Sequence, residues 1–311
     1  MAMEPLTPPI LKAGHSVGLV APARKVSEEE IAPAIKMFEE WGLKVVLGDH
    51  LYGSNNQFSG TDTERATDFM KMVENPEVRA IICARGGYGA VRLLDHLNLR
   101  ALQRDPKWVV GYSDITVFHG ILNSWYLMET IHGIMPINFP SDAAPNPSTE
   151  SLRRVLFGEN PEYIAPSHPF NRIGVGDGSL CGGNLSILYS LTGTDADIFT
   201  NDKVLFIEDL DEYLYHVDRM MLNLKRSGKL RGLAGLIVGG MTDMQDNTIG
   251  FGQNAIEIIR DAVAEYDYPV CFNFPAGHQG DNLALIMGRQ VTLKVANDGS
   301  TLFFSKPSST I

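Results

Sequence analysis

This 311-residue sequence contains few cysteines and no long apolar runs, and it has fewer basic than acidic residues. The three cysteines, Cys83, Cys181 and Cys271, lie far apart without Cys-x-x-Cys spacing, which indicates buried thiols in a reducing compartment and no disulfide framework. The longest apolar runs, such as residues 233–240, fall well short of the roughly 18 residues that span a bilayer. The chain does not open with a basic segment followed by an apolar one, so we expect no secretion signal. We therefore expect a cytoplasmic protein with no membrane partner.

Basic residues are outnumbered, with 26 Lys and Arg against 37 Asp and Glu, for a formal net charge of −11. Such a surface repels phosphate backbones, so we expect no nucleic acid partner. The composition of 44% hydrophobic and 20% charged residues, with 30 Gly and 17 Pro, excludes collagenous, low-complexity and wholly disordered chains. At about 150 residues per domain, the length indicates two domains or one large one.

The first half alternates short apolar runs with amphipathic helical patterns, which is typical of parallel βα units. Ser27 is a helix N-cap candidate, and the acids that follow it suit the first turn of a helix. The pattern predicts strands at 16–21, 44–47, 80–84 and 108–111, and helices from 27 to about 41 and at 63–73, 91–97 and 115–126. We therefore predict a doubly wound α/β domain over residues 1–140.

Residues 141–170 have the Pro- and Ser-rich composition of a linker, interrupted by a short helix around 150–156. A mixed α/β domain is predicted over 171–311. It is expected to contain Gly-rich turns at 174–183, helices at 185–191 and 213–224, and strands at 203–207, 234–239, 269–273, 283–287 and 290–295.

A serine stands where an apolar strand turns directly into a helix, in the run VVGYSDIT at 109–116. A nucleophile at Ser113 would be lifted clear of the sheet, and the amide of Asp114 can face an oxyanion. The alternative is that Ser113 or Asp114 only caps the helix. The second glycine of the Gly-x-Ser-x-Gly motif is missing, so an ordinary α/β-hydrolase is not indicated.

A second strand ends in the glycine turn RGGYG at 85–89. Glycines let a backbone approach a ligand closely, so the amides of Gly86 and Gly87 are candidate oxyanion or anion donors. The turn is not a dinucleotide fingerprint, because Arg92 occupies the position of the third glycine. A tight turn without a ligand is the structural alternative.

Histidine is the usual general base near neutral pH, and His278 lies in a polar Gly-rich loop between two apolar strands. Glu208 begins an acidic cluster, EDLDE at 208–212, at the end of a strand. A carboxylate there can orient a histidine and stabilise its charged form. A solvated loop and a divalent metal site are the alternatives. No His-Glu-x-x-His pair occurs, which disfavours a zinc peptidase.

Together these segments resemble the LD-carboxypeptidase family of serine peptidases, which also includes the microcin C self-immunity peptidases. The motifs that carry the resemblance follow one order along nearly the whole chain: SVGLVAPA at 16–23, ARGGYG at 84–89, GYSD at 111–114, GGNLS at 182–186, GT at 193–194, ED at 208–209 and GH at 277–278. The resemblance implies a flavodoxin-like N-terminal domain, a smaller swivelling β/β/α C-terminal domain and a homodimer.

By this likeness Ser113 is the nucleophile, Glu208 the acid and His278 the general base, in agreement with the interpretation of each residue above. The site would then lie in the cleft between the two domains, because Ser113 belongs to the first and the other two to the second.

The likeness also implies acyl transfer through a covalent intermediate, without a metal or organic cofactor. The family hydrolyses the amide between the L-centre of a diamino acid and the terminal D-alanine of peptidoglycan tetrapeptides, which are recycled wall fragments in the cytoplasm. Arg85, Gly183 and Asn184 are expected at the substrate, although Arg85 fits a local salt bridge equally well.

Two other functions stay open. The microcin-immunity branch cleaves aminoacyl-nucleotide amides and carries a longer loop with an aromatic residue that stacks on the nucleobase. Here all three tryptophans lie in the first domain and residues 167–183 offer only Phe170, which favours the tetrapeptide. The other alternative is a non-catalytic peptidoglycan-fragment binding protein, since a sequence does not show that three side chains meet.

Overall fold

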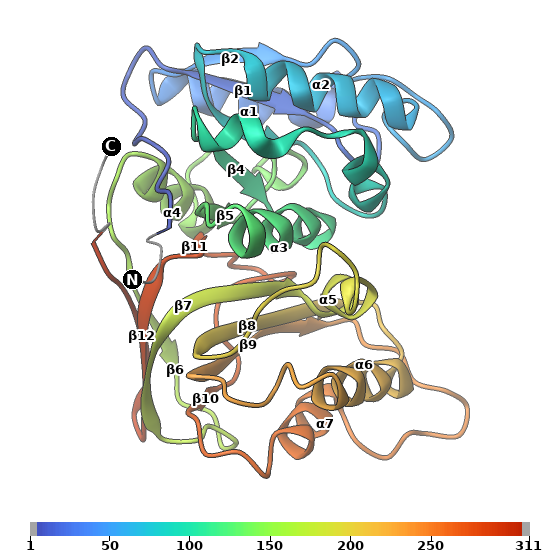
Figure 1. Ribbon diagram of the computed structural model, residues 1–311, viewed down its shortest axis with the longest axis vertical. Coiled ribbons are helices and arrows are strands. Elements are labelled where there is room, and N and C mark those ends of the chain that lie inside the picture. Colours follow the sequence, from blue (N-terminus) through green and yellow to red (C-terminus); the bar gives the residue numbers. More distant parts are fainter. Residues whose placement is uncertain (1–4, 307–311) are drawn as a thin grey trace.

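The computed structural model describes residues 5–306, which form two β-sheets with helices packed on them (Figure 1). Residues 1–4 and 307–311, the outer ends of the two expected domains, lie outside the described part. The predicted α/β fold class is confirmed. Its swivelling motion stays a prediction.

The first sheet has the strand order β11-β5-β4-β3-β1-β2. Its strands are β1 (Ser16–Val20), β2 (Lys44–Leu47), β3 (Val78–Cys83), β4 (Trp108–Gly111), β5 (Thr130–His132) and β11 (Leu285–Met287). Strands β1 to β5 are parallel in the order 2-1-3-4-5 of flavodoxin-like sheets. Strand β11 is antiparallel to β5.

Two of the helices of this layer begin where the sequence has capping residues. Ser27 and Glu30 form a capping box at the start of the first helix, and Thr61 and Glu64 form another at the start of the second. The segment predicted as a helix at 91–97 is a 3₁₀ helix instead. The helices are α1 (Glu28–Glu40), α2 (Asp62–Glu74) and α3 (Thr116–Trp125), with 3₁₀ helices at η1 (Ala90–His96), η2 (Leu99–Gln103), η3 (Ser113–Ile115) and η4 (Pro136–Asn138).

The second sheet has the order β10-β9-β8-β7-β12-β13-β6, parallel from β7 to β10 and antiparallel in the rest. Its strands are β6 (Glu162–Pro166), β7 (Gly174–Asn184), β8 (Lys203–Leu210), β9 (Gly235–Thr242), β10 (Val270–Cys271), β12 (Gln290–Ala296) and β13 (Gly299–Phe304). Helices α5 (Leu185–Leu191), α6 (Leu214–Arg226) and α7 (Ala255–Ala262) accompany it.

The prediction of Gly-rich turns at 174–183 is wrong, because this segment is the long strand β7. Its glycines serve close packing of neighbouring backbone. A methyl group added at Gly176 would lie 2.0 Å from the carbonyl oxygen of Ala234, and one at Gly182 would lie 2.0 Å from that of Phe206. Glycine is therefore needed here to let another chain segment approach.

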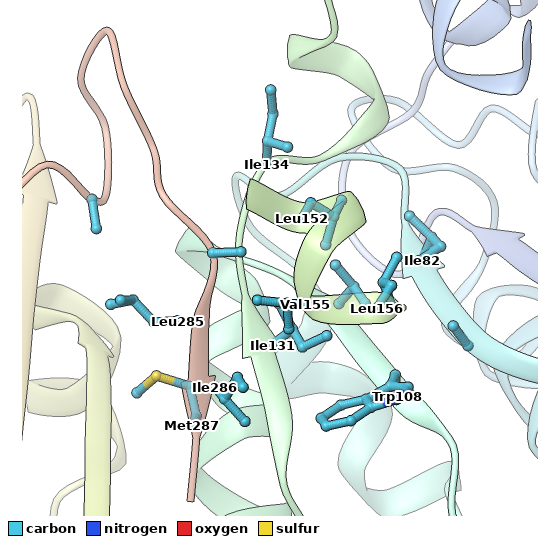
Figure 2. Close-up of a cluster of buried hydrophobic side chains, with 14 of the residues drawn as sticks. Ile82, Trp108, Ile131, Ile134, Leu152, Val155, Leu156, Leu285, Ile286 and Met287 are labelled. Atoms are coloured by element: carbon cyan, nitrogen blue, oxygen red, sulfur yellow. The ribbon is translucent and has the colours of Figure 1, made fainter. Parts of the chain in front are cut away.

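The chain crosses between the two sheets more often than a simple two-domain division implies. Strand β11 comes from the expected second domain, yet it pairs with β5 of the first sheet. Residues 141–170, expected as a linker, contain α4 (Pro147–Leu156) and the edge strand β6. Figure 2 shows Leu152 and Val155 of α4 beside Ile131 of β5 and Ile286 of β11, in one buried cluster.

A buried ion pair joins the chain after β11 to the residue before β5. Arg289, just after β11, donates from Nε to Glu129 Oε1 at 2.6 Å and from Nη2 to Oε2 at 2.5 Å. Both side chains are almost fully buried, so each charge depends on the other. The pair fixes the return of the chain to the edge of the first sheet.

None of the helices formed by residues 5–306 is long and apolar enough to cross a membrane. The cytoplasmic location and the homodimer stay predictions.

Candidate active site

Ser113 lies at the corner between β4 and α3. Its φ of 62° is in the left-handed region, which residues other than glycine seldom occupy. A strained serine between an apolar strand and a helix is the geometry of a nucleophile elbow, and such strain persists only where the surroundings hold it in place. Ser113 is half-buried, so its hydroxyl is not sealed in the core.

A buried histidine of α3 anchors this corner. His119 Nε2 lies 2.9 Å from the carbonyl oxygen of Gly111, and its Nδ1 lies 2.9 Å from Thr130 Oγ1. A carbonyl only accepts, so Nε2 carries the proton and Nδ1 accepts from the threonine. Burial lowers the pKa of His119 to about 4, which keeps it neutral. His119 was not among the residues predicted for the site.

The glycine turn after β3 packs directly on Ser113. A methyl group added at Gly86 would lie 3.1 Å from Ser113 Cβ and 3.3 Å from its Oγ. Gly87 has a φ of 102°, and its amide donates to no atom of residues 5–306. A free amide one residue beyond a glycine that packs on the serine is a candidate donor for an oxyanion hole.

The side chain of Asp114 ties this turn to the corner. Its Oδ2 accepts from the Ala90 amide at 2.8 Å, just after the glycine turn. Burial raises the pKa of Asp114 to about 6, although the hydrogen bond from Ala90 and the charges of Arg65 and Arg24 oppose that rise. The predicted oxyanion residues therefore lie on two turns that are bonded to each other.

Glu208, at the end of β8, is paired with His278. The imidazole Nδ1 lies 2.6 Å from Glu208 Oε2, and the His278 amide donates to the same oxygen at 3.1 Å. Glu208 is fully buried, and 14% of the His278 side chain is exposed. A carboxylate only accepts, so Nδ1 carries the proton and Nε2 is left to accept one.

Burial by itself lowers the pKa of His278, but the hydrogen bond and charge of Glu208, with a contribution from Asp209, raise it by more. The net pKa lies above the ordinary 6.5. Burial and the charge of Glu208 also raise the pKa of Asp209 to about 7. A carboxyl group with a raised pKa, here that of Asp209, next to a paired histidine is typical of functional sites.

The loop that carries His278 depends on Asn282 and α4. The Gly277 amide donates to Asn282 Oδ1 at 2.8 Å, and the Asn282 amide donates to Ser148 Oγ of α4 at 2.8 Å. The segment expected as a linker thus positions the histidine loop. Asn282 lies within the polar Gly-rich loop that the sequence indicated around His278, but no local pattern predicts its hydrogen-bond partner 134 residues away.

Tyr112 brings the two halves of the site together. Its ring centroid is 4.7 Å from that of His278, and Tyr112 is the residue directly before Ser113. The carboxyl ends of β4 and β8, on different sheets, therefore face each other.

The three expected substrate contacts lie in different surroundings. Arg85 Nη1 is 3.8 Å from Glu30 Oε1, so the local salt bridge exists. A methyl group at Gly183 would lie 2.5 Å from Thr116 Oγ1, which indicates a packing role against α3. Asn184 donates to Asp209 and caps α5. Substrate binding by these residues stays a prediction.

No group of three or more His, Cys, Asp or Glu side chains within residues 5–306 is arranged to hold a metal ion. The residues of the site are those of acid–base and nucleophilic chemistry: a hydroxyl, an imidazole with a free nitrogen, a buried carboxylate and unbonded amides.

Comparison with known proteins identifies both halves of the chain. Residues 17–133 match the model of the LD-carboxypeptidase N-terminal domain, and residues 177–293 match that of the C-terminal domain. A probable murein peptide carboxypeptidase of Bacillus subtilis is 32% identical over 93% of this chain and 92% of its own length.

Solved structures agree in fold. The muramoyltetrapeptide carboxypeptidase from Oxalobacter formigenes superposes with a TM-score of 0.85 at 26% identity, over 94% of this chain and all of that one. The microcin C7 self immunity protein MccF in complex with aspartyl sulfamoyl adenosine gives 0.86 at 22% identity, over 98% of this chain and all of that one, a likeness of fold alone. The chain therefore belongs to the LD-carboxypeptidase family, which confirms the resemblance and, with it, the predicted class of serine-type LD-carboxypeptidase.

Proposed function

We propose that this enzyme hydrolyses the amide between the L-centre of a diamino acid and the terminal D-alanine of peptidoglycan tetrapeptides. The observation that carries the proposal is the buried Glu208–His278 pair, 2.6 Å apart, whose imidazole ring lies 4.7 Å from that of Tyr112, the residue before the strained Ser113. The names of the Bacillus and Oxalobacter relatives support the substrate. We further propose that it works in the cytoplasm as a homodimer that serves murein recycling, which rests on the family resemblance.

In this mechanism Ser113 Oγ attacks the scissile carbonyl while His278 Nε2 takes its proton. Glu208 holds the proton of the ring on Nδ1 and stabilises the imidazolium that forms. The amides of Asp114 and Gly87, with Gly86 as the other candidate, donate to the oxyanion. His278 then returns the proton to the leaving D-alanine, and water repeats the sequence to release the tripeptide.

The environment of Phe170 supports the tetrapeptide over an aminoacyl-nucleotide. The guanidinium carbon of Arg260 lies 4.5 Å from the Phe170 ring centroid, and the His168 ring lies at 5.5 Å. Phe170 is thus already packed within this chain and is a poor platform for a nucleobase.

The direct test is release of D-alanine from purified tetrapeptides with meso-diaminopimelate or lysine at position three. We expect release from at least one peptide, at a kcat in the ordinary range of about 1–10³ s⁻¹. Aminoacyl sulfamoyl adenosine is the comparison substrate. Cleavage of that compound alone would contradict the proposal and favour the microcin-type activity, and cleavage of neither substrate would favour a binding protein.

Gly277→Ala should lower kcat/KM for the tetrapeptide at least about 100-fold. Gly277 has a φ of 96°, and an added methyl group would lie 2.6 Å from Glu208 Cβ and 2.8 Å from its Oε2. The substitution therefore displaces the acid or the histidine loop, and displacement of catalytic groups by about 1 Å costs rates of this order. Gly280→Ala in the same loop is the matched control, because nothing lies within 4 Å of its added methyl group. Equal activity of the two variants would show that the close contact has no catalytic consequence.

A further inference from the structure

Arg24 follows β1 at the carboxyl edge of the first sheet, opposite the glycine turn that follows β3. The strand order reverses between β1 and β3, and open α/β sheets bind ligands in the crevice at such a reversal. The Arg24 amide donates to the Gly86 carbonyl at 3.3 Å, so the two loops are joined there.

The side chain of Arg24 crosses Gly87. A methyl group added at Gly87 would lie 2.6 Å from Arg24 Cδ and 2.7 Å from its Nε. Gly86, the adjacent residue, packs on Ser113 in the same way. The arginine and the serine thus pack against two adjacent glycines, and a side chain at either glycine would collide with one of them.

The charge of Arg24 is available to a ligand. The side chain is exposed, and within residues 5–306 it forms no ion pair with a carboxylate. Arg85, the other arginine of these loops, instead lies near Glu30 and donates to the Lys25 carbonyl at 3.3 Å. Arg85 was the arginine expected at the substrate, but of the two arginines in these loops the structure leaves Arg24 as the unpaired one.

We propose that Arg24 binds the C-terminal carboxylate of the peptide and thereby restricts cleavage to the last residue. This inference rests on the proposed function, since it assumes that the scissile carbonyl lies at Ser113 and its oxygen near the Gly87 amide. In a terminal residue only the nitrogen and Cα separate the scissile carbon from the carboxylate carbon, a distance of about 3–4 Å. A guanidinium suits a carboxylate because it can donate two parallel hydrogen bonds.

The test compares two substrates, the tetrapeptide and the same peptide ending in D-alaninamide, which lacks the negative charge. Arg24→Ala should lower kcat/KM for the free acid about 10- to 100-fold and change that for the amide less than threefold. Arg24→Lys keeps the positive charge but lacks the planar guanidinium, so it should retain part of the preference for the free acid over the amide. Lys25→Ala is the control for the general electrostatic effect of removing a positive charge near the site. Lys25 is an exposed neighbouring cation whose Nζ contacts Ser54.

Three results would overturn the inference. An equal loss on both substrates would mean that Arg24 only supports the glycine turn. No loss on either would mean that it does not meet the substrate. In both cases active wild-type enzyme shows that the proposed function stands, whereas wild-type enzyme inactive on both peptides would remove the proposed function and this inference together.

Discussion

Ser113→Ala should reduce release of D-alanine at least about 10⁴-fold in kcat. The substitution removes the hydroxyl that forms the acyl intermediate, while the oxyanion donors and the binding contacts remain and supply only residual catalysis. Purified wild-type and variant enzymes would be compared at saturating tetrapeptide, together with labelling by a serine-reactive probe, which should be lost in the variant.

The control separates chemistry from folding. Ser190→Ala removes an exposed hydroxyl on α5 that contacts Ile187 O, and should leave activity within about twofold. Ser113→Gly should also be inactive but no less stable than the wild type, because a φ of 62° costs a residue with a Cβ atom about 1–2 kcal/mol. Substantial activity in Ser113→Ala would mean that Ser113 only starts the helix.

Glu208→Gln should reduce kcat about 10³- to 10⁴-fold. The neutral amide can present a donor to Nδ1, and the histidine then carries its proton on Nε2, the nitrogen that must accept the proton from Ser113. The side chain keeps its size in a fully buried position, so the loss is expected in kcat with little change in the folded structure.

The same variant should change the pH dependence of the reaction. The base must be neutral, so kcat/KM rises as pH passes the pKa of His278, and Glu208 holds that pKa above 6.5 in the wild type. In Glu208→Gln the negative charge that raises the pKa of His278 is removed, whereas the burial that lowers this pKa remains. The acidic limb of the pH profile should therefore move to lower pH.

A second glutamate–histidine pair in the same chain serves as the matched control. Glu212 Oε2 lies 2.5 Å from His216 Nδ1, outside the proposed triad. Glu212→Gln should alter kcat less than threefold and leave the acidic limb in place. If Glu208→Gln behaves like Glu212→Gln, Glu208 has no role in orienting the base.

Local sequence patterns were sufficient for many elements of the fold. Hydrophobic periodicity and capping residues predicted the strands β1 to β4 and the helix that Ser27 begins, because these depend on neighbours along the chain. The same reasoning failed at β7, where glycines that admit the backbone of β8 and its neighbours were interpreted as turns. Strands β5, β6 and β13 and helix α7 were also missed. For β6 the reason is physical, because this edge strand is fixed by pairing with β13, more than 130 residues away in the chain.

The candidate site divides in the same way. The Ser113 corner, the glycine turn and the polar loop around His278 each stand out as single segments, since a strained or glycine-rich turn after an apolar strand is a local feature. The residues that hold these segments in position cannot be recognised from the local sequence. Asn282 is held by Ser148 of α4, and Arg24 rather than Arg85 is left unpaired, because these outcomes depend on contacts between distant residues.

The sequence by itself determined which residues are candidates for the proposed chemistry, because a hydroxyl, an imidazole, a carboxylate and flexible glycines keep these properties wherever the chain places them. Only the tertiary structure decided which of them face one another. Strand β11 returns to the first sheet and α4 holds the loop beyond β10. The buried pairing of Glu129 with Arg289 then satisfies charges that neither half of the chain can satisfy alone, and the pairing of Glu208 with His278 joins two segments of the second half.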